Sequence, residues 1–202
     1  STDVLKGNSV LDAEGNWNQA TQSGVITKTP NIHAATSNGN FVFTACYNLG
    51  EIGVAKIEGN ELKEDINKAV NLKQDIVNKC GVNYGTDASV HGEGITVKGD
   101  NLYVLASVNL YGTYTDYDDG YIIQYGIGSD GTLTYKNFAR VGKNYDSTRL
   151  NIYNGKIFVS AIGGDQKYGA GNSETALHVA DISGDELKSE SYKIKVPSNV
   201  KC

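Results

Sequence analysis

The sequence predicts an all-β protein made of repeated units of four antiparallel strands, because one pattern of turns and apolar runs occurs three times in its 202 residues. Each copy opens with a glycine-containing turn and a short apolar run, at residues 38–43, 98–105 and 154–159. A second apolar run, a second turn and a leucine complete each copy. The openings recur about every 55–65 residues, a spacing typical of repeat architectures.

The composition favours strands joined by tight turns. Glycine is abundant, at 24 residues, and proline is rare, at 2. Glycine, asparagine and aspartate tolerate positive φ, and Asn-Gly or Asp-Gly pairs between apolar runs are typical of antiparallel hairpins. Residues 61–78 have mixed periodicity, which would also suit a helical turn. Since the equivalent positions of the other copies are strand-like, we expect a strand there.

The repeats divide the chain into three full units, at residues 30–80, 81–141 and 142–197. Residues 1–29 resemble the second half of a preceding unit, and residues 198–202 would begin the next element. Four antiparallel strands per unit is the plan of a β-propeller blade. We therefore expect about three and a half propeller-type blades, with a β-sandwich as the alternative.

The order of motifs resembles the lactonase-like and related seven-bladed propellers. The matching stretches are Tyr121-Ile122-Ile123-Gln124-Tyr125, then Asp130-Gly131-Thr132-Leu133-Thr134, then Ile157-Phe158-Val159. The resemblance spans residues 30–197, and the Trp-Asp dipeptide of WD-repeat propellers is absent. It implies a propeller fold and, as one possible activity, a hydrolase acting at the central channel.

Three and a half blades would leave the ring open. A propeller needs at least about four blades to close, and unpaired strand edges recruit partners. We expect another copy, or a missing segment, to complete the sheets.

The chain begins with Ser1 and contains no methionine, so we interpret it as a mature or cut polypeptide whose leader has been removed.

Polar residues recur on the first strand of each unit. The position five residues before the turn holds His33, Glu93 and Arg149, and His91 lies two residues before Glu93. First strands line the channel of a propeller, so we expect these side chains to converge there and to bind an anion, a sugar or a metal. The alternative is that they only hydrogen-bond one another and ordered water.

An acidic loop in the second unit contains Asp116, Asp118 and Asp119. Calcium binds several carboxylate or carbonyl oxygens in flexible loops. The EF-hand spacing is not met, however, and a solvated acidic turn is the preferred interpretation. No cofactor is expected other than Ca²⁺ at this loop.

Tyrosines cluster around the same loop. Tyr111, Tyr114 and Tyr117 lie in it, and Tyr168 occupies the corresponding loop of the third unit. A tyrosine ring suits sugar stacking or a protein interface, and loops on a rigid scaffold often carry recognition. We expect these tyrosines to bind a protein or glycan partner, with ordinary strand packing as the alternative.

The three cysteines match neither metal-ligand spacing nor a redox motif. A Cys46–Cys80 disulfide in an exported protein is one interpretation, and buried thiols are the other. Cys202 follows a context similar to that of Cys80, so its partner would lie in a following repeat.

Charge and motifs exclude several functions. The net charge is −5 and the sequence has no Lys/Arg cluster, which argues against nucleic-acid binding. It has no apolar run long enough for a membrane span, no nucleophile elbow and no phosphate-binding loop.

We predict a non-catalytic extracellular or cell-surface binding and assembly protein. The alternatives are a lactonase-like hydrolase and a structural subunit of a surface fibre or layer.

Overall fold

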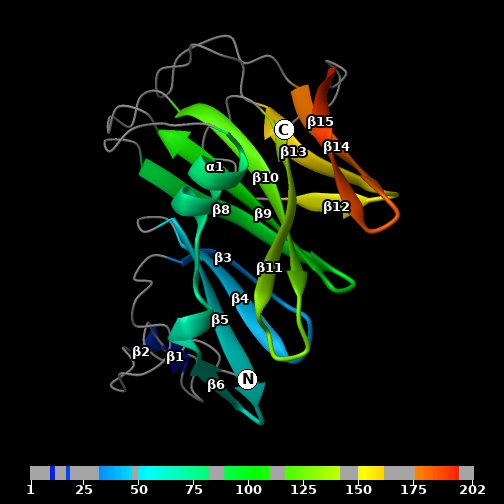
Figure 1. Cartoon of the computed structure of the whole chain (residues 1–202). Coiled ribbons are helices and arrows are strands. Elements are labelled where there is room, and N and C mark those ends of the chain that lie inside the picture. Colours follow the sequence, from blue (N-terminus) through cyan, green and yellow to red (C-terminus); the bar gives the residue numbers. More distant parts are fainter. Residues whose placement is uncertain are drawn as a thin grey trace.

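The computed structural model describes residues 10–11, 17–18, 32–46, 50–81, 89–109, 117–141, 150–161 and 176–195. These residues form three antiparallel sheets and a separate two-stranded hairpin, with one α-helix. The predicted all-β class is therefore confirmed. In Figure 1 the second sheet lies between the first and the third.

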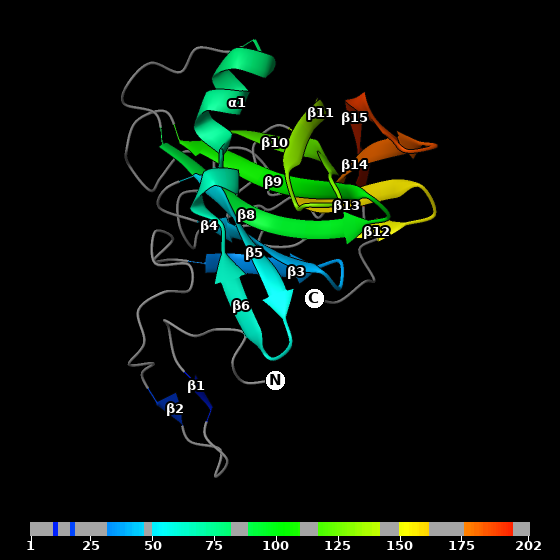
Figure 2. The same ribbon diagram turned by 60° about the horizontal axis from the view of Figure 1, so that its bottom comes forward.

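The first sheet contains five strands. In spatial order its main path is β3 (Ile32–Ser37), β4 (Phe41–Cys46), β5 (Glu51–Glu58) and β6 (Glu61–Glu64), and β7 (Val70–Asn71) also pairs with β5. The hairpin of β1 (Val10–Leu11) and β2 (Trp17–Asn18) forms its own small sheet, drawn apart from the others in Figure 2.

The second and third sheets repeat the same meander. The second contains β8 (Ser89–Lys98), β9 (Asn101–Asn109), β10 (Tyr117–Ile127) and β11 (Leu133–Arg140), paired in that order. The third contains β12 (Asn151–Tyr153), β13 (Lys156–Ala161), β14 (Ala176–Ser183) and β15 (Glu186–Lys195), also paired in chain order. Each is a four-stranded sheet of the kind that forms one propeller blade.

Two hydrophobic cores hold the three sheets together. The first joins side chains such as Phe43 and Val54 of the first sheet to Val104 and Ile123 of the second. The second joins Leu105 and other residues of the second sheet to residues of the third, Ile157, Val159 and Leu187 among them. The middle sheet is thus buried on both faces, as a blade between two neighbours must be.

The strand expected over residues 61–78 is wrong except at its two short strands, β6 and β7. A 3-10 helix, η2 (Ile66–Lys68), and helix α1 (Leu72–Lys79) follow β6. The Asn71 side chain accepts a 2.9 Å hydrogen bond from the Gln74 backbone N–H and so caps α1. Leu72 and Ile76, one helical turn apart, are buried in the first core. Local capping and helical spacing here outweigh the pattern of the other repeats.

The predicted Cys46–Cys80 disulfide is not formed, because both residues are thiols. Cys46 shares a face of β4 with Thr44, and 3.9 Å separates the Thr44 hydroxyl oxygen from Cys46 Sγ. Cys80, directly after α1, packs against the core that contains Phe43, on the opposite face of the sheet. Adjacent strand residues point to opposite faces, so the backbone of the first sheet separates the two sulfurs.

Candidate functional site

The first strands of the first two sheets are irregular at equivalent positions. In β3, Ile32 pairs with Cys46 and Ala34 with Ala45, which leaves His33 as the extra residue of a β-bulge. In β8, Gly92 pairs with Ala106 and Gly94 with Leu105, which leaves Glu93 as the extra residue. A bulge redirects its side chain and is common beside functional sites. The two bulges therefore set the directions of His33 and Glu93.

The redirected side chains meet. His33 Nδ1 lies 3.0 Å from Glu93 Oε2, and His91 Nδ1 lies 3.9 Å from Glu93 Oε1. Glu93 is fully buried, whereas 31% of the His33 side chain is exposed. The structure thus brings together three of the four channel residues considered in the sequence, with the carboxylate inside and one imidazole at the surface. We call His33, His91 and Glu93 the His–Glu cluster.

Gly92 permits the close approach of β8, which carries His91 and Glu93, to β4 of the first sheet. A Cβ atom at Gly92 would lie 3.0 Å from the backbone N and 3.1 Å from the backbone O of Cys46. These atoms belong to the end of β4, which leaves little room for a side chain. A glycine between His91 and Glu93 therefore lets β8 lie directly against the first sheet.

The cluster suits proton exchange and hydrogen bonding. An imidazole donates from one nitrogen and accepts at the other, and a carboxylate at one nitrogen fixes the ring orientation. In the described part of the chain, no group of three or more histidines, cysteines or carboxylates is arranged to hold a metal ion.

The other predicted site residues are not placed. Arg149, Tyr111, Tyr114, Tyr168 and Asp116 lie outside the described residues. The backbones of Tyr117, Asp118 and Asp119 begin β10, with an irregular register between Tyr117 and Asp119, but their side chains are not described. The calcium loop and the tyrosine-rich binding loops therefore remain predictions.

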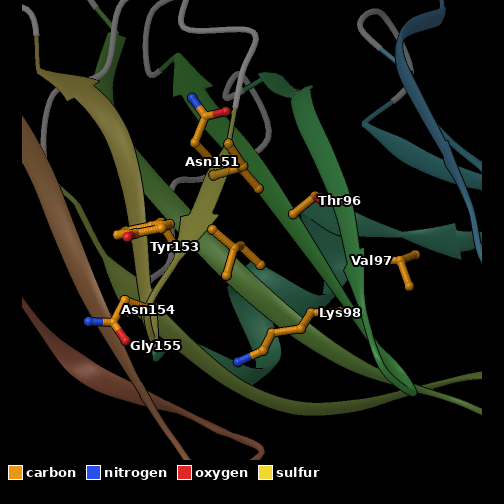
Figure 3. A pocket seen from close by; sticks show the side chains of 9 residues that line it. Thr96, Val97, Lys98, Asn151, Tyr153, Asn154 and Gly155 are labelled. Atoms are coloured by element: carbon orange, nitrogen blue, oxygen red, sulfur yellow. The ribbon is translucent and has the colours of Figure 1, made fainter.

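A pocket of about 600 Å³ lies between the first strands of the second and third sheets. Its lining comprises Thr96, Val97, Lys98, Leu150, Asn151, Ile152, Tyr153, Asn154 and Gly155. In Figure 3, Thr96 and Lys98 extend from β8 toward β12, and Val97 points to the other side of its strand. The volume is within the usual range for small-molecule sites. Sequence reasoning missed this pocket, since its residues appear only as ordinary strand and turn positions.

The pocket and the His–Glu cluster occupy different stretches of β8. Thr96 lies three residues beyond Glu93, which corresponds to about 10 Å along an extended strand. Both features belong to the first strands of their sheets, where the sequence pattern predicted a polar lining. No helix among the described residues has the length and apolar character needed to cross a membrane.

Comparison with known proteins shows the fold alone. No family model matches the chain, and no curated protein matches it. A putative 6-phosphogluconolactonase from Bacteroides uniformis has a similar structure, with a TM-score of 0.55 and 13% identity over 92% of this chain and 49% of that chain. Glutaminyl cyclase from Myxococcus xanthus gives a TM-score of 0.40 with 10% identity over 78% of this chain and 50% of that one.

The chain spans about half the length of these solved structures. The likeness to the Bacteroides protein agrees with the three stacked, four-stranded meanders described above. The chain is therefore an all-β protein built from blades of the β-propeller type.

Proposed function

We propose that this chain is a propeller-type binding protein that recognises a small polyhydroxylated ligand at the His–Glu cluster. The observation that carries the proposal is the 3.0 Å contact between His33 and the fully buried Glu93, at matched bulges on neighbouring first strands. The bulges, the glycine at position 92 and the buried carboxylate together hold one partly exposed imidazole in a fixed orientation.

Sugars suit such a site. Each hydroxyl group both donates and accepts hydrogen bonds, and an oriented imidazole can meet either requirement. The nearby pocket adds Thr96 and Lys98 on the same strand, which would contact a longer or acidic glycan. In this proposal the segments with Tyr111, Tyr114, Tyr117 and Tyr168 contact a protein or glycan partner, and the protein acts outside the cell or on its surface.

Ligand binding can be tested by titrating ¹⁵N-labelled protein with neutral sugars and sugar acids while the histidine ring resonances are observed by NMR. We expect a saturable shift of the His33 and His91 signals, and in His33→Ala the shift of the His91 signals should be lost. Glu93→Gln keeps the shape of the side chain but removes its charge, so it should weaken binding about tenfold or more. That factor corresponds to about 1.4 kcal/mol, the size of one charge-assisted hydrogen bond.

The matched control is Glu186→Gln, which makes the same substitution at an exposed position in β15. It should bind like the parent chain. If no sugar or sugar acid shifts the His33 signals, or if Glu186→Gln weakens binding as much as Glu93→Gln, the proposed binding site is wrong.

The second candidate function is lactone hydrolysis, which the likeness to a putative 6-phosphogluconolactonase favours. In this mechanism Glu93 orients His33, and the imidazole takes a proton from a water molecule. The water oxygen bonds to the lactone carbonyl carbon, the ring C–O bond breaks, and the proton passes to the departing ring oxygen.

Lactone turnover separates the two candidates. Hydrolysis of glucono-δ-lactone or 6-phosphogluconolactone above the uncatalysed rate, lost in both His33→Ala and Glu93→Gln, would favour the hydrolase. Saturable binding without turnover would favour the binding protein.

A further inference from the structure

The pocket between the second and third sheets has one polar wall, on β8. Cross-strand pairing places Thr96 beside Tyr103 on one face of the second sheet, and Tyr103 is buried in the core shared with the third sheet. Thr96 therefore faces the third sheet, as does Lys98 two residues further along the strand. Val97, between them, packs against the first core on the other face. Figure 3 shows the same alternation.

Both walls of the pocket are edge strands. In spatial order β8 lies beside β9 alone and β12 beside β13 alone, within the sheets that the structure describes. Each of the two hairpins closes with a two-residue turn, so the pair beside the turn exchanges its hydrogen bonds and the next residue points its N–H and C=O away from the partner strand. These next residues are Val97 and Ile152, and both line the pocket. The pocket therefore offers backbone donors and acceptors from two sheets.

The turn that forms one end of the pocket has a fixed shape. Asn154 and Gly155 have φ values of 48° and 73°, as in a type I′ turn, whose twist matches that of the strands it joins. This end of the pocket is thus formed without a ligand, which lowers the entropy that binding must overcome.

Lys98 gives the pocket a positive charge. It is the only charged side chain in the lining. Lys63 pairs with Glu58 and Lys156 with Asp181, but no described carboxylate lies within ion-pair distance of Lys98. An ammonium group in a hollow of the surface attracts anions, so the charge favours an acidic ligand.

The floor of the pocket is apolar. Leu150 is buried in the second core, and Ile152 packs against that core. The volume of about 600 Å³ would hold a small molecule. An acidic sugar matches these features together: its carboxylate suits Lys98, its hydroxyl groups suit Thr96 and the backbone groups, and its C–H face suits the floor.

We propose that this pocket binds a hexuronate, the acidic residue of a glycan. The inference deepens the proposed function and rests on it for the polyhydroxylated class of ligand. It adds a second binding region on β8, beyond the His–Glu cluster, with Lys98 as the residue that selects for charge.

Titration of the ¹⁵N-labelled 202-residue chain with sodium glucuronate tests the proposal. The backbone amide signals of Thr96, Lys98 and Ile152 should shift saturably, with a Kd of about 1 mM for a ligand of this size. Glucuronamide has nearly the same shape but no charge, and it should bind at least about tenfold more weakly.

Lys98→Gln removes the charge at an exposed position and should leave the fold intact, which the spectrum of the free variant establishes. It should weaken glucuronate binding at least about tenfold and change glucuronamide binding less than about twofold, because only the carboxylate interacts with the missing charge. Lys188→Gln is the matched control, the same change at an exposed position of β15 outside the pocket. It should bind both ligands like the parent chain.

The His33 ring signals, recorded in the same titrations, separate this inference from the proposed function. Pocket shifts that depend on Lys98, without a His33 shift, support the pocket and contradict binding at the His–Glu cluster. His33 shifts without pocket shifts overturn the pocket and leave the cluster as the binding site. The absence of both shifts overturns both proposals.

The choice of ligand is tested separately. Equal affinity for glucuronate and glucuronamide overturns the role of Lys98. Equal affinity for glucuronate and N-acetylalanine, a carboxylate with a peptide group and no sugar hydroxyl groups, overturns the assignment to a sugar acid.

Discussion

The backbone N–H of Leu187 donates a 2.9 Å hydrogen bond to the side-chain carbonyl oxygen of Gln124, and the bond joins the third sheet to the second inside the protein. The side-chain N–H of Gln124 donates a 2.6 Å hydrogen bond to the backbone oxygen of Asp185. Gln124 is fully buried in β10. One side chain therefore binds both the turn that connects β14 to β15 and the beginning of β15.

Gln124→Leu should lower the free energy of unfolding by about 2–4 kcal/mol. The leucine is similar in size but leaves a buried backbone N–H and a backbone oxygen without the amide, and each such loss costs about 1–3 kcal/mol. Urea denaturation gives the value. Gln74→Leu, the same change at an exposed position of α1, should alter the free energy by less than about 0.5 kcal/mol. Equal effects at the two positions would contradict a role for Gln124 in joining the sheets.

The contact between the first and second sheets depends on a glycine. Gly131 has φ +83°, and a Cβ atom there would lie 2.6 Å from the Phe41 ring. Gly131→Ala should lower the free energy of unfolding by about 1 kcal/mol through φ, and by a further 1–3 kcal/mol or so through the clash with the ring. Gly59→Ala, at φ +61° with no atom within 4 Å of its Cβ position, should show the first loss alone. A double mutant with Phe41→Leu should recover part of the difference, and no recovery would contradict the clash.

The repeat pattern predicted the sheets because each repeat carries its own turns. Leu62, Leu133 and Leu187 each follow the second turn of a repeat and pair with Ile57, Ile127 and Ile182. The position five residues before the first turn also led to His33 and Glu93. That prediction depended only on the number of residues between each site residue and its turn. Because β3 and β8 each contain one extra residue at the equivalent position, this number is the same in both strands.

Contacts between sheets could not be predicted in the same way. The residues equivalent to Gln124 are Val54 and Val179, so its link to the next sheet belongs to one repeat alone. Helix α1 likewise depends on the Asn71 side chain, which caps its first turn. The face of a sheet on which a cysteine lies depends on the alternation of side chains along its strand. The similar sequences before Cys80 and Cys202 do not show this face.

Cys80 should be almost inert to alkylation in the folded protein. Burial, with a smaller contribution from the Asp75 charge, raises the pKa of its thiol from 9.0 to about 12. At pH 8 the thiolate fraction of such a group is about 10⁻⁴, and the thiolate is the reactive form. Mass spectrometry after iodoacetamide treatment should find Cys80 unmodified in the native chain and modified in guanidinium chloride. Rapid native modification at pH 8 would contradict the burial.

The same group should make the folded state less stable at high pH. The folded thiol holds its proton up to about pH 12, while the unfolded thiol loses it near its ordinary value, so the unfolded state binds fewer protons between these values. The free energy of unfolding therefore falls as the pH rises from about 9 toward 12. Burial also raises the pKa of Tyr135 to about 12, which adds to the decline above pH 10. Urea denaturation at several pH values should show a shallower decline for Cys80→Ala, and an identical slope in that variant would be evidence against the assignment.

The His–Glu cluster should depend on the glycine that separates its two β8 members. Gly92→Ala places a Cβ 3.0 Å from the backbone of Cys46 and 3.2 Å from the Cβ of Ala45, and backbone atoms cannot turn aside as a flexible side chain does. The strand β8 should therefore move away from β4 and lengthen the contact between His33 and Glu93. NMR signals of the His33 ring should shift toward those of the Glu93→Gln variant. Gly126→Ala in β10 is the control, because its new Cβ meets mainly the flexible Lys136 side chain. It should leave the His33 signals unchanged, and equal shifts in the two glycine variants would show that the close contact between Gly92 and Cys46 does not determine the His33 environment.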